Sequence, residues 1–208
     1  MWLPEDPAIA AELARLHEAS AASDAARAAR GGFKADENTD DIVRLGSEYL
    51  AVSPAEGEFL YMLARGMQAR VVVEFGASFG LSTLYLAAAL RATGGHLSTT
   101  EIHPDKCAAL RASLDRAGVT DCVTLLEGDA RDTLQTVEGS VDMVLLDGWK
   151  SMYLPVLDLL KPKLRPGAMV AADNISLAST RPYMDHVSDP ASGFLTREVN
   201  DLGLSVKL

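Results

Sequence analysis

The sequence predicts an α/β protein built on a mostly parallel sheet with helices on both faces. From residue 70 onward, short apolar runs alternate with amphipathic stretches, and this alternation is typical of parallel sheets. Two of the runs, VDMVLL and AMVAA, are almost continuously apolar, as expected for strands that are buried on both faces. Near the C-terminus, two short runs flank a turn with Gly203, which indicates an antiparallel hairpin at the sheet edge.

The expected elements follow one another in a regular order. The predicted strands are 71–75, 96–101, 123–127, 141–147 and 168–173, followed by the hairpin strands 193–199 and 204–208. The predicted helices between them are 82–91, 104–116, 131–137 and 153–163. Gly118 follows the second of these helices, where glycine favours a left-handed C-cap. Periodicity therefore accounts for most of the chain beyond residue 70.

Residues 1–47 are predicted to be a helical appendage to a domain formed by residues 48–208. An Ala-rich helix is expected over 7–30, because Asp6 can cap it and Pro7 suits its first turn. Residues 33–47 are polar and are expected to form a loop or short helix. The appendage would pack over the cleft or against a second subunit.

Composition narrows the class of protein. The 208 residues carry a formal net charge of −10, which argues against a nucleic-acid binder with a basic face. Two cysteines are too few for a disulfide scaffold. The longest apolar run, 84–90, is much shorter than the roughly 20 residues that span a bilayer. We expect a cytoplasmic protein with a small-molecule partner and no membrane or nucleic-acid partner.

Acidic residues follow nearly every predicted parallel strand. They are Glu74, Glu101, Glu127, Asp129, Asp147 and Asp173. Ligands of open parallel sheets bind at the carboxyl edge of the strands, and like charges held close together repel. This pattern indicates a site that receives cations. The alternative interpretation is that the acids are helix caps or solvated turn residues.

The loop after the first strand reads EFGASFG. A dinucleotide fingerprint would need glycine at 78 and 81, but Ser78 and Leu81 occupy these positions. Glu101 ends the next strand, about 20 residues further on, where an acid can accept both hydroxyls of a ribose. An adenosyl ligand without a pyrophosphate fits these features. S-adenosylmethionine is favoured, because its sulfonium and ammonium groups also suit an acidic edge.

A divalent metal site is predicted at the ends of the fourth and fifth strands. Asp147, Asp173 and Asn174 offer three hard oxygen ligands, which suit Mg²⁺, with Ca²⁺ or Mn²⁺ as alternatives. Three protein ligands leave about three positions of an octahedron for a dihydroxy substrate and one water. Adjacent strand residues point to opposite faces, so Asp173 and Asn174 share a metal only if the backbone turns there. An Asp–Asn turn beside an unrelated acid is the alternative.

Lys150 is the candidate general base. It follows Asp147 by three residues, and a neighbouring dication would disfavour its ammonium form. The amine could then accept a proton from the substrate. The alternative is a solvated surface lysine. Trp149 would cover the adenine of the cofactor or fill the core.

These stretches resemble one known family, the divalent-cation-dependent O-methyltransferases of the caffeoyl-CoA and catechol type. The resemblance covers roughly residues 50–175, and DGWK (147–150), DN (173–174) and EFGASFG (74–80) are its most specific parts. It implies a Rossmann-like S-adenosylmethionine-dependent methyltransferase fold, with seven strands of which the last is antiparallel, and a homodimer. Gly148 departs from the family pattern, which usually has a larger residue there.

The resemblance also implies roles for individual residues. It implies metal ligation by Asp147, Asp173 and Asn174, with Lys150 and Asp147 as the catalytic pair. The cofactor-binding residues expected from the loop, the spacing and the resemblance are Val52, Glu74, Gly76, Ser78, Gly80, Ser82, Glu101, Ile102, Asp129, Ala130, Asp147 and Trp149.

The predicted function is metal-dependent transfer of a methyl group from S-adenosylmethionine to a hydroxyl of a vicinal dihydroxy-aromatic molecule. One alternative is a metal-independent methyltransferase that acts on nitrogen or on a carboxylate. The other is a module that binds S-adenosylmethionine without catalysis. The sequence leaves the identity of the acceptor open.

Overall fold

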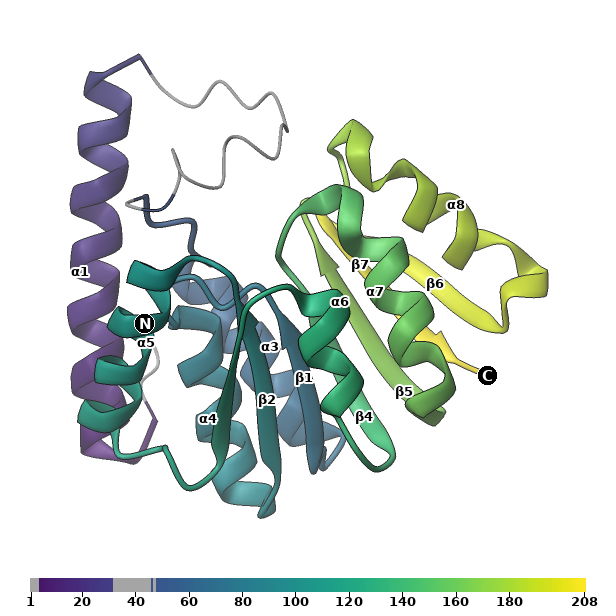
Figure 1. The fold of residues 1–208 in the computed structure, drawn as a ribbon, viewed down its shortest axis with the longest axis horizontal. Coiled ribbons are helices and arrows are strands. Elements are labelled where there is room, and N and C mark those ends of the chain that lie inside the picture. Colours follow the sequence, from purple (N-terminus) through teal and green to yellow (C-terminus); the bar gives the residue numbers. More distant parts are fainter. Residues whose placement is uncertain (1–3, 32–45, 47) are drawn as a thin grey trace.

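A computed structural model describes residues 4–31, 46 and 48–208 (Figure 1). It contains one seven-stranded sheet. The strands are β1 (Val71–Phe75), β2 (His96–Glu101), β3 (Val123–Glu127), β4 (Val141–Leu146), β5 (Leu164–Asp173), β6 (Phe194–Val199) and β7 (Leu202–Lys207). Their order across the sheet is β3-β2-β1-β4-β5-β7-β6. The strand β7 runs antiparallel to both β5 and β6, and the other pairs are parallel, so the predicted fold class is confirmed.

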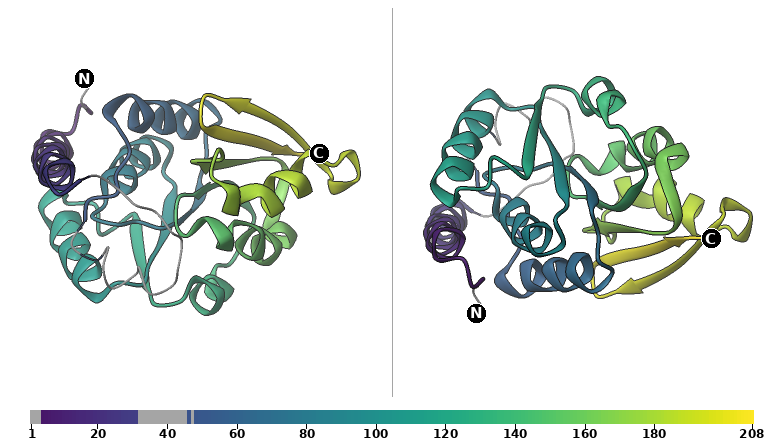
Figure 2. Two further views of the ribbon diagram at one scale, coloured as in Figure 1. Left: turned by 90° about the horizontal axis from the view of Figure 1, so that it is seen from above. Right: turned by 90° about the horizontal axis from the view of Figure 1, so that it is seen from below.

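Helices cover both faces of the sheet (Figure 2). The longer helices are α1 (Pro7–Ala29), α3 (Pro54–Gly66), α4 (Leu81–Thr93), α5 (Pro104–Ala117), α7 (Tyr153–Leu160) and α8 (Arg181–Ser188), and α6 (Ala130–Thr133) is a single turn. Side chains of α3, α4 and α5 pack with Val72 and Leu145 in one core cluster. Side chains of α7 and α8 pack with Val73 and Leu146 in the other. Because successive strand residues face opposite sides, each central strand contributes to both clusters.

The helix α1 packs on the outside of α4 and α5. Its predicted N-cap is confirmed, because the Asp6 carboxylate accepts hydrogen bonds from Ala8 N and Ile9 N at 2.9 and 3.3 Å. Ile9, Leu13 and Leu16 are buried in the core cluster that also contains side chains of α4 and α5. The predicted loop or short helix over 33–47 lies outside the described residues, except for Gly46.

Several predicted boundaries were wrong. The strand β5 begins at Leu164, four residues before the predicted start. Gly203 lies within β7, and Asn200 and Asp201 form the hairpin turn. The helices α3 and α8 were not predicted from the sequence. A signal for α3 was present, because Ser53 and Glu56 form a reciprocal capping box at its start. Among the described residues, no helix is both long and apolar enough to span a membrane.

Candidate active site

The loop after β1 lies against the loop after β4. Gly76 has φ +96°, and a Cβ there would lie 2.6 Å from the Gly148 backbone. Gly80 has φ +98° and caps the start of α4. Both positions therefore require glycine: one for the approach of two backbones, the other for a left-handed N-cap.

Gly148 is explained by its neighbour Phe75. A Cβ at position 148 would lie 2.6 Å from atoms of the Phe75 ring. The large side chain at the end of β1 thus occupies the space that a larger residue at 148 would need. Glycine at position 148, where the family usually has a larger residue, is therefore explained by the packing of the Phe75 ring against it.

Three backbone N–H groups hold the Glu101 carboxylate in place. Ser78 N donates to Oε2, and Ile102 N and His103 N donate to Oε1, each at 2.8 Å. Ser78 reaches this position with φ +49°. A carboxylate has about four acceptor sites, and these three N–H groups use three of them, so Glu101 keeps about one acceptor site, on Oε2, for a ribose hydroxyl.

Glu74 is buried beneath this loop. Thr83 and Thr99 donate hydrogen bonds to its Oε2 at 2.6 and 2.5 Å, while Oε1 has no hydrogen-bond partner among the described residues. Burial raises the pKa of Glu74 to about 7, against hydrogen bonds from Ser82, Thr83 and Thr99 that lower it. Glu74 therefore orders β1, β2 and the start of α4, and its unpartnered oxygen is available to a donor.

Lys150 lies between two oxygen acceptors. Its Nζ donates to Asp147 Oδ1 at 3.0 Å and to Tyr153 Oη at 2.8 Å, and the residue is 9% exposed. The Tyr153 hydroxyl donates in turn to the carbonyl of Asp173 at 2.9 Å. Lys150 is thus a buried, oriented group, and the alternative of a solvated surface lysine does not hold.

Tyr153 is a site residue that the sequence analysis missed. It is fully buried, and its ring lies edge-on to both Phe75 and Tyr183. Its hydroxyl joins the loop after β4 to the end of β5. The three-residue spacing from Lys150 at a helical turn was the available signal.

The carboxyl groups of Asp147 and Asp173 meet at the ends of adjacent strands. Burial raises the pKa of Asp147, against the Lys150 ammonium and a hydrogen bond with Asp173. Burial and then the Asp147 carboxylate raise the pKa of Asp173 to about 7. Two carboxyl groups with raised pKa values bind a proton or a cation in preference to both remaining charged and unpaired.

The backbone turns at Asn174, which is the condition for Asp173 and Asn174 to share a metal. The strand ends at Asp173, and Asn174 has φ +54°, so the backbone turns between the two residues. No group of three or more His, Cys, Asp or Glu is placed to hold a metal among the described residues. A metal at this position would therefore take Asn174 as its third protein ligand. Two carboxylates and an amide are a donor set that fits a hard divalent cation.

Other predicted site residues are placed less specifically. Asp129 caps α6 and pairs with Arg131, while Glu127 pairs with Arg111, so both follow the alternative interpretation of caps and solvated acids. Ser82, Ala130 and Val52 are buried, and Ile102 is 42% exposed. Trp149 is half-buried and belongs to neither core cluster, and its contact with adenine stays a prediction.

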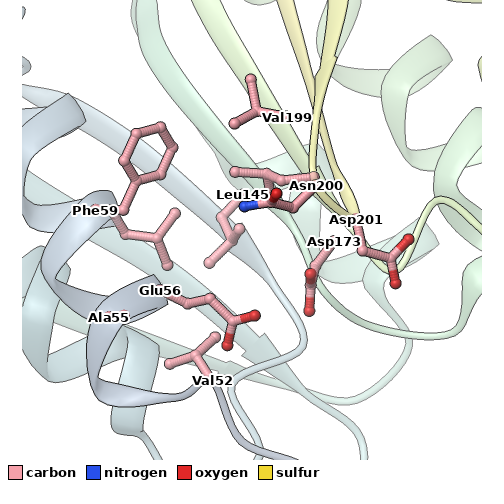
Figure 3. Close-up of a pocket in the computed structure, with 11 residues that line it drawn as sticks. Val52, Ala55, Glu56, Phe59, Leu145, Asp173, Val199, Asn200 and Asp201 are labelled. Carbon is pink, nitrogen blue, oxygen red and sulfur yellow. The ribbon is translucent and has the colours of Figure 1, made fainter.

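A cavity of about 240 Å³ opens beside Asp173 (Figure 3). It lies between the start of α3 and the turn that joins β6 to β7. The residues that line it are Val52, Ala55, Glu56, Phe59, Leu60, Leu145, Asp173, Val199, Asn200, Asp201 and Leu202. Since Asp173 is one wall, a molecule in this cavity would lie next to the paired carboxyl groups.

Comparison with known proteins identifies the family. A methyltransferase domain model matches residues 73–175. A catechol O-methyltransferase from Niastella koreensis is 36% identical over 141 residues, which are 66% of this chain and 63% of that protein. A catechol O-methyltransferase from Sus scrofa is 31% identical over 143 residues, which are 65% of this chain and 76% of that protein. The chain belongs to the class I O-methyltransferase family.

Solved structures of the family agree with this assignment. The cofactor-bound structure of Rv0187 from MTB is 29% identical, with a TM-score of 0.72, and the match covers 98% of this chain and 90% of that one. The predicted membership in the O-methyltransferase family is therefore confirmed. This O-methyltransferase chain spans slightly less than two thirds of the Niastella koreensis relative that it matches.

Proposed function

We propose that the protein is an S-adenosylmethionine-dependent O-methyltransferase that uses a divalent cation and methylates a vicinal dihydroxy-aromatic molecule. The observation that carries this proposal is the meeting of the Asp147 and Asp173 carboxyl groups beside the buried Lys150. Family membership supports methyl transfer to oxygen. The relatives named as catechol O-methyltransferases support a vicinal diol as the acceptor.

Each residue of the site has a defined task in this proposal. Asp147, Asp173 and Asn174 would hold the cation, and Glu101 would orient the ribose of the cofactor. When bound, S-adenosylmethionine supplies an electrophilic methyl group, and the divalent cation supplies a Lewis acid that makes a nearby hydroxyl more acidic. As a neutral amine, Lys150 Nζ would accept the proton of the acceptor hydroxyl, and Asp147 and Tyr153 hold the nitrogen in place. Positioning of this kind supplies a large part of many enzymatic accelerations, about 7–11 kcal/mol in favourable cases.

One observation favours a metal-independent methyltransferase as the second candidate. Lys150 pairs with Asp147 at 3.0 Å, so the ammonium already compensates one of the two carboxylates without a metal. In that case the cluster would be a polar cleft, and Lys150 would orient an acceptor instead of deprotonating it.

A methyl-transfer assay separates the two candidates. Purified protein is treated with EDTA, dialysed and assayed with S-adenosylmethionine and a panel of vicinal diphenols, with and without Mg²⁺. We expect no turnover after EDTA and full recovery with Mg²⁺. Phenols with a single hydroxyl serve as the control acceptors and should remain unmethylated. Undiminished activity in EDTA would remove the metal from the mechanism.

A further inference from the structure

The cavity beside Asp173 has two chemically different parts (Figure 3). One part of its lining is apolar, with Phe59 and Leu60 from α3, Leu145 from β4, and Val199 and Leu202 from the hairpin. Its charged lining residues are Glu56, Asp173 and Asp201. No Lys, Arg or His is among the described residues that line it.

Hydrogen bonds to the backbone hold two of these acids in place. Glu56 Oε2 accepts from Ser53 N at 2.7 Å, as part of the capping box of α3. Asp201 Oδ1 accepts from Ser176 N at 2.7 Å, which joins the hairpin turn to the loop after β5. The other oxygen of each carboxylate accepts no backbone hydrogen bond from the described part of the chain, and Figure 3 shows Glu56 reaching from α3 toward Asp173.

The size of the cavity limits its occupant. An enclosed apolar space of about 150 Å³ accepts benzene, so a cavity of about 240 Å³ has room for one aromatic ring with a short substituent. Because Asp173 is one wall, such a ring would reach the paired carboxyl groups with its hydroxyls. A second fused ring system would extend out of the cavity.

We infer that this cavity binds the ring and substituent of the acceptor, and that Glu56 and Asp201 make the enzyme select a single-ring diol with an uncharged or cationic substituent over one with an anionic substituent. The inference rests on the proposed function. A carboxylate or a phosphate-bearing thioester would enter an acidic cavity of a chain with a net charge of −10, where like charges repel. An ammonium group would be attracted by the carboxylates of Glu56 and Asp201, which backbone hydrogen bonds hold in position.

The test compares three catechols that carry a propyl, an aminoethyl or a carboxymethyl group para to one hydroxyl. We expect the kcat/KM of the wild-type enzyme to be at least about tenfold lower for the carboxymethyl compound than for the aminoethyl compound. Glu56→Gln keeps the capping box, because glutamine also accepts the Ser53 N–H. Glu56→Gln should reduce the ratio of kcat/KM for the aminoethyl catechol to kcat/KM for the carboxymethyl catechol by about two- to fivefold, as expected for a partly exposed charge. Glu56→Lys should reduce this selectivity ratio further.

A matched control removes a carboxylate from the same helix at a position that does not line the cavity. Glu58→Gln changes the net charge by the same amount and should leave the ratio unchanged. Binding of the three catechols to protein loaded with S-adenosylhomocysteine and Mg²⁺, measured by calorimetry, gives a readout that is independent of turnover. Binding in the expected order without methyl transfer would retain the charge selection and overturn the proposed function. If wild type, Glu56→Gln and Glu56→Lys all transfer methyl groups with the same ratio of kcat/KM between the aminoethyl and carboxymethyl catechols, the proposed function stands and the inference is overturned.

Discussion

Glu12 in α1 and Asp173 at the end of β5 are both largely shielded carboxylates, yet they have opposite surroundings. Arg15 and Arg116 each donate two hydrogen bonds to Glu12, at 2.6–2.9 Å. Burial opposes the charge of Glu12, but these bonds lower its pKa to about 2. Asp173 faces another carboxyl group instead, and burial together with the Asp147 carboxylate raises its pKa to about 7.

The difference separates a carboxylate that stabilises the fold from one that is held for a ligand. Glu12 is compensated by the protein itself, and it fixes α1 to α5. Asp147 and Asp173 share one lysine, so the folded chain leaves negative charge uncompensated at the sheet edge. Such uncompensated charge costs stability and is typical of functional sites.

The largest effect is expected from Asp173→Asn. Turnover should fall by at least about a thousandfold, because a metal ligand is lost. Thermal unfolding of the metal-free protein should nevertheless occur at a higher temperature than in wild type, since the substitution removes the repulsion from Asp147. Calorimetry in EDTA at neutral pH measures this. A lower unfolding temperature would show that Asp173 stabilises the fold, as Glu12 does.

The substitution Lys150→Ala should reduce kcat by about a hundredfold or more, the usual range for a general base. Affinity for S-adenosylhomocysteine, measured by calorimetry, should change little. Lys161→Ala provides the matched control, since that lysine lies at the end of α7 and is expected to leave kcat unchanged. An unaltered kcat in Lys150→Ala would exclude the lysine from the reaction.

A smaller effect, about tenfold on kcat, is expected for Tyr153→Phe. The change removes a hydrogen bond to a charged group and frees Lys150 on one side. KM values for cofactor and diol should stay the same, which distinguishes loss of positioning from loss of binding. Tyr183→Phe is the control, because Tyr183 packs edge-on to Tyr153 with ring centroids 5.7 Å apart and its hydroxyl is hydrogen-bonded to neither Lys150 nor Asp173. Equal losses of kcat in both variants would indicate a general packing defect.

The smallest effect on catalysis is expected for Glu12→Gln, which should leave kcat unchanged. The free energy of unfolding should fall by about 1–2 kcal/mol, a modest value because both arginines are about half exposed. The folded pKa of about 2 lies below the ordinary value of 4.5. The stabilisation by Glu12 is therefore complete above pH 4.5 and is lost as the pH falls toward 2. Acid unfolding of the two proteins measures it, and their stabilities should converge at low pH.

Local patterns in the sequence determined most of the sheet. The strands β1 to β4 and the helices α4 and α5 were predictable, because apolar runs, glycine stops and helical periodicity are local signals. The start of β5 was predicted too late, since Pro166 and Gly167 interrupt its apolar pattern. The turn of the hairpin was displaced because Gly203 is in fact a strand residue that packs near Ile175 and Met184.

The sequence by itself determined which acids stand at the ends of the strands, and it indicated that Asp173 and Asn174 need a turn of the backbone to act together. Only the tertiary structure decided which of those acids are compensated. Glu127 and Asp129 have arginine partners and Glu74 is buried against two threonines, whereas Asp147 and Asp173 meet each other. The physical reason is that the charge balance of a carboxylate depends on side chains brought close by packing. Asp173 lies beside Lys150, Tyr153 and the acid-lined cavity because packing brings together loops that follow different strands. The spacing of residues along the sequence does not reveal this proximity.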